Sequence, residues 1–183
     1  NSLGAKTIVK DGTGRLIAGD IPAGHKAIFQ YNGASIVLLN PKAILTPKFF
    51  EAYEAATQSI ASGLWTKVVL TSELYDADNV FDSATNYRLI IPNGETWYIY
   101  GQVALDSVAD GKTVIASLYL NGGSYRENYQ VAPSSGSLTT PQVWGIRTGN
   151  GTDYFELWVY QNDTVSRNTA IGKQYIFFGG AKI

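Results

Sequence analysis

The chain contains no cysteine and no methionine, and it has a single histidine, His25. The absence of cysteine excludes disulfide bonds, zinc–thiolate sites and cysteine nucleophiles. One histidine cannot build a histidine-based metal cluster, and no G-x-S-x-G nucleophile elbow accompanies it. Because His25 follows Pro22-Ala23-Gly24, we expect it to lie at the surface or in a turn.

Charge is also scarce, since charged residues make up 16% of the chain against roughly 25% in typical soluble domains. The net charge of -1 gives no electrostatic basis for binding nucleic acid, whose backbone selects clusters of Lys and Arg. No apolar run approaches the roughly 18 residues that a membrane span requires. We therefore expect no nucleic-acid partner and no membrane insertion.

The N-terminal sequence NSLGAKTIVK lacks the apolar run of a signal peptide and does not begin with methionine. We expect the chain to be a fragment, or the processed C-terminal part, of a longer protein.

Three regions follow one another along the 183 residues. Residues 1–43 consist of short β segments between turns, and the Asn32-Gly33 pair between two apolar runs predicts a hairpin. Residues 44–63 are predicted to form a helical connector, and residues 64–183 to form an antiparallel β domain. The predicted fold class is thus all-β with one short helix: a small β module, a helical connector and a jelly-roll sandwich.

The helix prediction rests on residues 46–63. Thr46 is a suitable N-cap, Pro47 suits the first helical position, and Ser62-Gly63 supplies a stop. Apolar residues at heptad spacing form one seam: Phe49, Tyr53, Ala56 and Ile60. The helix would either lie on its own domain or join a short parallel bundle at a trimer axis.

Residues 64–183 contain about eight apolar, β-prone segments separated by turn signals such as Asn93-Gly94 and Asp110-Gly111, with no helical pattern between them. Such a succession indicates an antiparallel sandwich or barrel, and the domain length suits a jelly roll.

Several of these strands carry aromatic residues on both faces. In the segment 97–105, the core face would hold Trp97, Ile99, Val103 and Leu105, which leaves tyrosines on the other face. A second aromatic face exceeds what monomers normally expose, so it predicts a subunit interface. The residues assigned to this interface are Tyr98, Tyr100, Tyr154, Trp158, Tyr160 and Phe178.

Acidic residues give no distinctive site. Asp76, Asp78 and Asp82 could ligate calcium but lack the EF-hand spacing, and a solvated loop is the alternative. A carboxylate pair for glycoside hydrolysis would have to come from four glutamates that no spacing singles out: Glu73, Glu95, Glu127 and Glu156. We therefore predict a protein that is not an enzyme and has no catalytic residues, metal site or cofactor.

A turn-rich region, GGSYRENYQVAPSSGS, and the strand after it combine aromatic with polar side chains. Tyrosine and tryptophan offer flat apolar area, while Arg, Glu and Asn supply directed hydrogen bonds, which suits a sugar or a polar protein patch. The alternative is that these aromatics only pack or contact other subunits. The predicted receptor-binding residues are Tyr125, Arg126, Glu127, Tyr129, Trp144 and Arg147.

The stretch FDSATNYRLIIPNGETWYIYGQVAL resembles the jelly-roll heads of the complement and tumour-necrosis-factor superfamily. The matching positions are Phe81-Asp82, Tyr87, Pro92, Gly94, Tyr98 and Tyr100. The aromatic ending Phe177-Phe178-Gly179-Gly180 also resembles that family. Over residues 64–183 this resemblance implies a homotrimer whose aromatic faces meet at a threefold axis.

The first region resembles a module of bacteriophage tail and fibre proteins, through the strings AGDIPAG and YNGASIVLLNP. This resemblance implies a virion tail fibre or receptor-binding protein, located on an extracellular particle. Its expected partners are other fibre or baseplate proteins and a host cell-surface glycan or protein. The alternatives are a structural or trimerising cap of a fibre and a polysaccharide depolymerase.

Overall fold

The computed structural model describes residues 6–10, 14–18, 20–21, 23–24, 26–39, 47–134 and 136–183. The chain divides into two compact units, residues 1–46 and residues 47–183. Two sequence predictions, His25 at the surface or in a turn and Thr46 as a helix N-cap, concern residues that lie outside the described ranges. Within the described ranges no helix has the length and apolarity needed to cross a bilayer.

The first unit contains a small four-stranded sheet with the order β2-β1-β4-β3. Its strands are β1 (Ile8–Lys10), β2 (Gly14–Arg15), β3 (Phe29–Tyr31) and β4 (Ile36–Leu38). The predicted Asn32-Gly33 hairpin is confirmed, because β3 pairs antiparallel with β4 and Gly33 has a φ of 95°. The Asn32 side chain accepts hydrogen bonds from the amides of Ala34 and Ser35, which fixes the turn.

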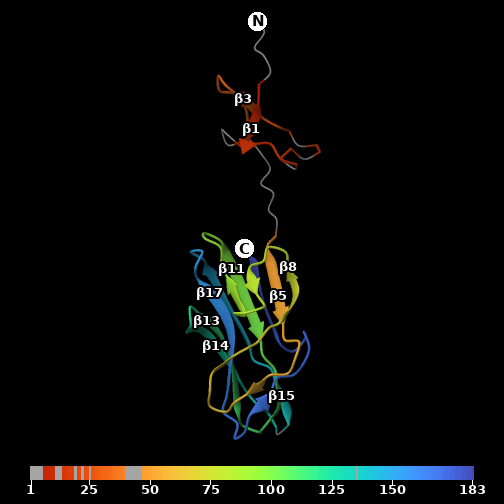
Figure 1. The fold of residues 1–183 in the computed structure, drawn as a ribbon, viewed down its shortest axis with the longest axis vertical. Helices are drawn as coiled ribbons and strands as arrows, with labels where there is room; N and C mark the ends of the chain where they lie inside the picture. The colour runs from red at the N-terminus through yellow and green to blue at the C-terminus, as the bar shows by residue number, and fades with distance from the viewer. Residues whose placement is uncertain are drawn as a thin grey trace. The chain divides into compact units, whose positions relative to one another are not determined.

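The second unit is a sandwich of two antiparallel sheets (Figure 1). The five-stranded sheet has the order β16-β11-β19-β5-β8, and the six-stranded sheet the order β14-β13-β17-β10-β9, with β7 paired to β17. Two small pairs, β12 with β15 and β18 with β6, complete it. This arrangement confirms the predicted jelly-roll sandwich.

The strands of the second unit have the following bounds. The five-stranded sheet contains β5 (Phe49–Tyr53), β8 (Ser72–Asp76), β11 (Thr96–Gln102), β16 (Gln142–Thr148) and β19 (Phe177–Lys182). The six-stranded sheet contains β7 (Thr66–Lys67), β9 (Phe81–Asp82), β10 (Arg88–Ile90), β13 (Thr113–Leu120), β14 (Gly123–Val131) and β17 (Tyr154–Gln161). The small pairs are β6 (Ser59–Ile60), β12 (Leu105–Val108), β15 (Ser137–Thr139) and β18 (Arg167–Asn168).

The predicted helical connector is wrong, because residues 49–53 form strand β5 and the described residues contain no helix. In β5, Phe50 and Ala52 are buried in the core between neighbours β19 and β8. Phe49 and Tyr53 are four residues apart, and that spacing shares a face in a strand as well as in a helix. The spacing alone therefore does not distinguish a helix from a strand, and the pairing of β5 with β19 and β8 determines that a strand forms.

The core fills the space between the two sheets. Trp97, Ile99, Val103 and Leu105 have no exposed surface, as the alternation in this segment predicts. They pack in one continuous cluster with Phe50, which stacks on Phe81 at a centroid distance of 5.2 Å. Since this core occupies the inner faces, the side chains on the outer faces determine what each sheet can contact.

Candidate functional site

The outer face of the five-stranded sheet carries an apolar surface that we call the aromatic face. The cross-strand register aligns Trp144 with Tyr100 and Gly179, and aligns Ile146 with Tyr98 and Ala181. Directly opposed residues point to the same side of a sheet, so these side chains share one surface. The face comprises Phe49, Tyr53, Tyr75, Tyr98, Tyr100, Trp144, Ile146 and Phe177.

Much of this face is open in the single chain. Trp144 is 63% exposed, Tyr75 54% and Ile146 49%. The rings contact one another, with Tyr98 lying 6.3 Å from Trp144 and 5.8 Å from Tyr100 between centroids. A contiguous exposed apolar surface of this kind is typical of a protein–protein contact.

One charged group lies within the aromatic face. The Glu51 carboxylate accepts a hydrogen bond of 3.0 Å from the Tyr100 hydroxyl. Burial, together with the neighbouring Glu51, raises the pKa of Tyr100 to about 12, so the phenol stays protonated as the donor. Gly179 leaves the space for the Tyr100 ring, because a Cβ at that position would approach the ring atoms to 2.5 Å.

The structure divides the six predicted interface residues into three groups. Tyr98 and Tyr100 lie on the aromatic face, as expected from the alternation. Tyr154, Trp158 and Tyr160 lie on β17, which belongs to the other sheet of the sandwich. The two outer faces of a sandwich point in opposite directions, so one contact through a sheet face cannot use both groups.

The assignment of Phe178 to an exposed interface is wrong. Its side chain has no exposed surface and packs edge-on against Phe50 and Phe81 in the core, at centroid distances of 5.3 Å and 5.8 Å. Its neighbour Phe177 takes the outward position and contacts Tyr100 at 6.1 Å. The pairing of β19 with β11 and β5 sets this alternation.

The aromatic residues of the six-stranded sheet are largely occupied with one another. Trp158 stacks on Tyr119 at 4.5 Å, and Trp65 contacts both Tyr119 and Tyr160. The Trp158 indole also donates a hydrogen bond of 2.9 Å to Glu156, which is ion-paired with Lys67. This cluster is half-buried within the single chain, in contrast to the open aromatic face.

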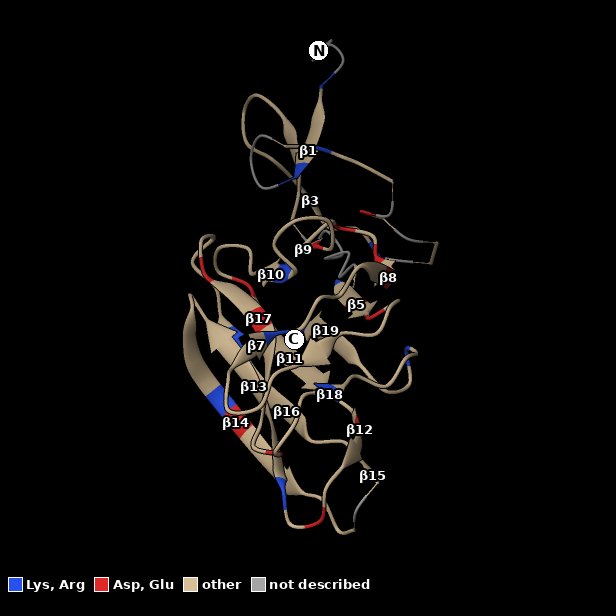
Figure 2. Cartoon of the chain, turned by 60° about the horizontal axis from the view of Figure 1, so that its bottom comes forward, with Lys and Arg blue, Asp and Glu red and all other residues tan. Residues whose placement is uncertain are grey.

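Three of the predicted receptor-binding residues meet at one edge of the sandwich. Arg126, Glu127 and Trp144 line a hollow of about 390 Å³, which we call the edge hollow. Arg126 and Glu127 form adjacent blue and red segments on β14 (Figure 2). The remaining lining residues are Asn128, Gln142 and Val143. Trp144 therefore belongs to both the edge hollow and the aromatic face.

The other three predicted receptor-binding residues lie elsewhere. Tyr125 turns inward, where its ring contacts Phe155 at 5.4 Å and its hydroxyl donates to the Ile146 carbonyl. Arg147 pairs with the buried Asp153 at 3.2 Å. Tyr129 of β14 is 69% exposed and lies opposite Ile115 of β13. Only Tyr129 among these three offers an open ring.

Two of the three aspartates considered for calcium, Asp76 and Asp82, use their carboxylates within the chain, whereas Asp78 is exposed. Asp76 accepts hydrogen bonds from the amides of Val80 and Phe81. Asp82 accepts from the amides of Ala84, Thr85 and Asn86 and from the Asn86 side chain. These bonds hold the pKa of Asp82 below its ordinary value, with the Thr85 amide as the largest contribution. Among the described residues no cluster of three or more acidic or histidine side chains could hold a metal.

Two of the glutamates considered for catalysis are held in ion pairs. Glu95 bonds to Lys48 at 2.7 Å and to Lys182 at 3.1 Å, and it accepts from the Trp97 indole. Burial raises the pKa of Glu95, but these hydrogen bonds outweigh it and lower the pKa to about 2. Glu156 is ion-paired with Lys67. Both carboxylates therefore tie strands together.

A scan against sequence models of protein families gives no match. A search of curated protein sequences likewise returns none that is significantly similar.

Solved structures do resemble the second unit. Mouse APRIL, in a crystal structure at pH 5.0, has 12% sequence identity and a TM-score of 0.57, over 75% of this chain and 100% of the APRIL chain. Eiger TNF from S. frugiperda has 9% identity and a TM-score of 0.57, over 75% of this chain and 91% of its own. The globular domain of zebrafish complement 1qA protein has 14% identity and a TM-score of 0.53, over 75% and 98%. At these identities the likeness shows the fold alone, which is a jelly-roll head of the tumour-necrosis-factor and complement type.

Proposed function

We propose that this chain is part of a bacteriophage tail fibre whose head assembles as a homotrimer and binds a glycan on the host surface. The observation that carries the proposal is the aromatic face, on which Trp144, Tyr75 and Ile146 are about half exposed or more. The fibre assignment rests on the AGDIPAG and YNGASIVLLNP strings of the first unit.

A second and third copy of this chain are the partners that suit the aromatic face. The family that the head resembles in fold is one in which three heads surround a threefold axis. Burial of rings such as Trp144 and Tyr98 would contribute roughly 25 cal/mol for each Å² of apolar surface removed from water. The Tyr100–Glu51 hydrogen bond gives the one carboxylate on this face a partner before assembly.

Receptor binding is supported by the chemistry of the head surface. The edge hollow combines an indole with a guanidinium, a carboxylate and two side-chain amides. These groups match the apolar ring faces and hydroxyl groups of a sugar. Three copies of a weak site in one trimer would raise avidity by roughly 10² to 10⁴.

The solution mass of the chain and its binding to host cells test the proposal together. We expect a trimer by light scattering and binding to cells that free cell-wall polysaccharide competes away. A monomer at micromolar protein concentration would contradict the assembly. A trimer that does not bind cells would instead favour the structural cap, in which Trp144 serves only the subunit contact. Release of reducing ends from host polysaccharide would indicate the depolymerase.

The Glu127→Ala variant separates binding at the edge hollow from assembly, because Glu127 lines that hollow and lies outside the aromatic face. Tyr129→Ala tests the predicted role of Tyr129 separately, since this 69% exposed residue lies outside both surfaces. Cell binding by the Trp144→Ala variant must be measured together with the solution mass of that variant, since Trp144 belongs to both the edge hollow and the aromatic face. Tyr125→Ala would instead report on packing against Phe155.

A further inference from the structure

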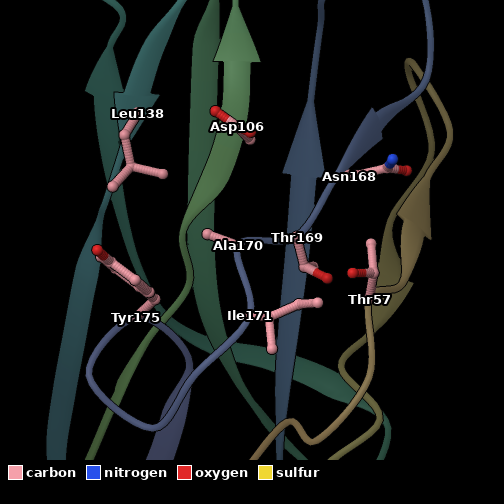
Figure 3. Close-up of a pocket in the computed structure, with 8 residues that line it drawn as sticks. All are labelled: Thr57, Asp106, Leu138, Asn168, Thr169, Ala170, Ile171 and Tyr175. Atoms are coloured by element: carbon pink, nitrogen blue, oxygen red, sulfur yellow. The ribbon is translucent and has the colours of Figure 1, made fainter.

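A second pocket lies in the head, apart from both the aromatic face and the edge hollow. Its volume is about 470 Å³, and Figure 3 shows Tyr175 and Leu138 on one side and Thr57 and Asn168 on the other. Asp106 belongs to β12 and Leu138 to β15, whereas Asn168 ends β18. Segments far apart in the sequence therefore build this pocket, which we call the tip pocket.

The tip pocket lies toward the end of the sandwich opposite to the one where the chain enters. In Figure 1, the start of β5 and the C-terminus lie at one end of the sandwich, and β15 lies at the other. Leu138, which lines the pocket, is the central residue of β15. The tip pocket therefore lies at the end of the second unit away from the start of its first strand, β5.

Hydrogen bonds hold the walls of the tip pocket in place. The Gln102 side-chain amide donates to the carbonyls of Gln174 and Tyr175, at 3.1 Å and 2.9 Å. On the other side, the Thr169 hydroxyl accepts from the Gln58 amide at 2.7 Å. The Ala170 amide donates to the Ala104 carbonyl at 2.9 Å. Walls fixed in this way reduce the ordering cost of binding a ligand.

The lining groups indicate the class of ligand. Asp106, Asn168 and Thr57 are exposed and supply a carboxylate, an amide and a hydroxyl, while Tyr175, Leu138 and Ile171 supply apolar surface. The Asp106 carboxylate accepts a weak contact of 3.4 Å from the hydroxyl of the adjacent Ser107. No lysine or arginine is among the described residues that line the pocket, which disfavours an anionic ligand.

Two buried polar groups next to this wall lack hydrogen-bond partners. Glu54 is 1% exposed with both carboxylate oxygens unpaired, and the Thr139 hydroxyl is also buried and unpaired. Thr139 follows Leu138 and pairs with Leu105, which in turn bridges to Thr169. Buried polar atoms without partners are unusual and demand a ligand, a proton or an ordered water. Polar groups therefore occur both among the exposed residues that line the tip pocket and among the buried residues next to it.

We infer that the tip pocket binds a neutral sugar residue of the host glycan. The Asp106 carboxylate accepts hydrogen bonds from the hydroxyl groups of the sugar, and the Asn168 amide donates hydrogen bonds to them. This inference rests on the proposed receptor-binding function and names the site and the ligand class. Tyr175 supplies a ring against which the apolar side of the sugar packs.

Saturation-transfer NMR on the purified trimer tests the inference, with methyl glycosides of glucose, galactose, mannose and N-acetylglucosamine as probes. We expect transfer to at least one of these glycosides and none to glucuronic acid. Asp106→Ala should weaken binding about 10-fold or more, as loss of a hydrogen bond to a charged group does. Asp78→Ala removes an exposed carboxylate outside the pocket and is the matched control.

Host-cell binding separates failure of this inference from failure of the proposed function. Loss of cell binding in Asp106→Ala and Asn168→Ala, with the trimer intact, supports the tip pocket. Cell binding that survives both variants but is lost in Glu127→Ala places the receptor at the edge hollow and overturns the inference alone. Absence of transfer to every neutral glycoside also overturns it, whether or not the cells are bound.

Discussion

The hydroxyl of Tyr100 donates a hydrogen bond of 3.0 Å to the carboxylate of Glu51, across the strand β19 that separates them. The two residues lie in one row of the aromatic face, with Gly179 between them. The row continues to Trp144 on one side and to Tyr75 on the other. A charge is thereby held in an ordered position within a surface that we propose to be buried on assembly.

Tyr100→Asp is expected to dissociate the proposed trimer while the subunit remains folded. The substitution removes a ring from the aromatic face and places a second carboxylate close to Glu51, and like charges that lose water repel strongly. Light scattering should show the mass of a monomer, and circular dichroism should retain the β signal.

Ile99→Asp is the matched control for this variant, because Ile99 adjoins Tyr100 in β11 but has no exposed surface. A buried unpaired carboxylate should unfold the subunit itself. If Tyr100→Asp unfolds as Ile99→Asp does, the aromatic face is part of the subunit's own stability and not an assembly surface.

Gly179→Ala is expected to weaken both the subunit and the trimer. Its Cβ would meet ring atoms and the hydroxyl of Tyr100 at 2.5 to 2.8 Å, so the ring must move away from Glu51. Overpacking of this kind costs about 1–3 kcal/mol, which thermal or urea unfolding would measure. Gly123→Ala is the control, since its nearest contact would be an ordinary 3.7 Å to the Leu120 carbonyl. Equal stability of the two variants would contradict the close approach of Tyr100 to Gly179.

Trp144→Ala and Trp158→Ala distinguish the two outer faces of the sandwich. Trp144 is 63% exposed on the aromatic face, whereas Trp158 is stacked on Tyr119 and bonded to Glu156. We expect Trp144→Ala to weaken trimer association with little change in subunit stability. Trp158→Ala should instead cost the subunit about 2 kcal/mol and leave its assembly unchanged. The reverse result, measured by analytical ultracentrifugation and thermal unfolding, would move the interface to the six-stranded sheet.

Local patterns in the sequence predicted the sandwich because strands such as β11 alternate inward with outward side chains over much of their length. The alternation of Trp97 and Ile99 with Tyr98 and Tyr100 identifies a core face without knowledge of any partner strand. In the pair Phe177-Phe178 both residues are aromatic, so the local sequence does not show which one is buried. The pairing with β11 decides it, and that partner lies far away in the chain.

Other features of the site depend on contacts that no short pattern contains. The placement of Trp144 beside Tyr100 requires the register of β16 against β11. The alternation of Trp144 and Ile146 with Val143 and Gly145 shows only that Trp144 and Ile146 share one face of a strand, and it does not show which face is buried. The tip pocket is harder to predict, because Thr57, Asp106, Leu138 and Tyr175 come from four separate segments.

Glu54→Gln is expected to stabilise the protein at alkaline pH and to have little effect in acid. Glu54 is 1% exposed, and burial raises its pKa from 4.5 to about 7, although the nearby Thr169 hydroxyl acts in the opposite direction. That hydroxyl donates to the Gln58 carbonyl at 3.2 Å, which is consistent with the carboxylate having no partner. Below pH 4.5 the carboxyl group is protonated in both the folded and the unfolded chain. Between pH 4.5 and about 7 it ionises only in the unfolded chain, so the free energy of unfolding falls as the pH rises.

Urea unfolding of the wild type and the Glu54→Gln variant at several pH values measures this effect. At about pH 8 the variant should be more stable by on the order of 1–3 kcal/mol, because a neutral amide avoids the cost of a buried charge. The difference should shrink toward the ordinary pKa of a glutamate. Glu73→Gln, at an exposed position of β8, should show no such dependence on pH and serves as the control. A difference between wild type and Glu54→Gln that stays constant from acid to alkaline pH would show that Glu54 is not protonated by its burial.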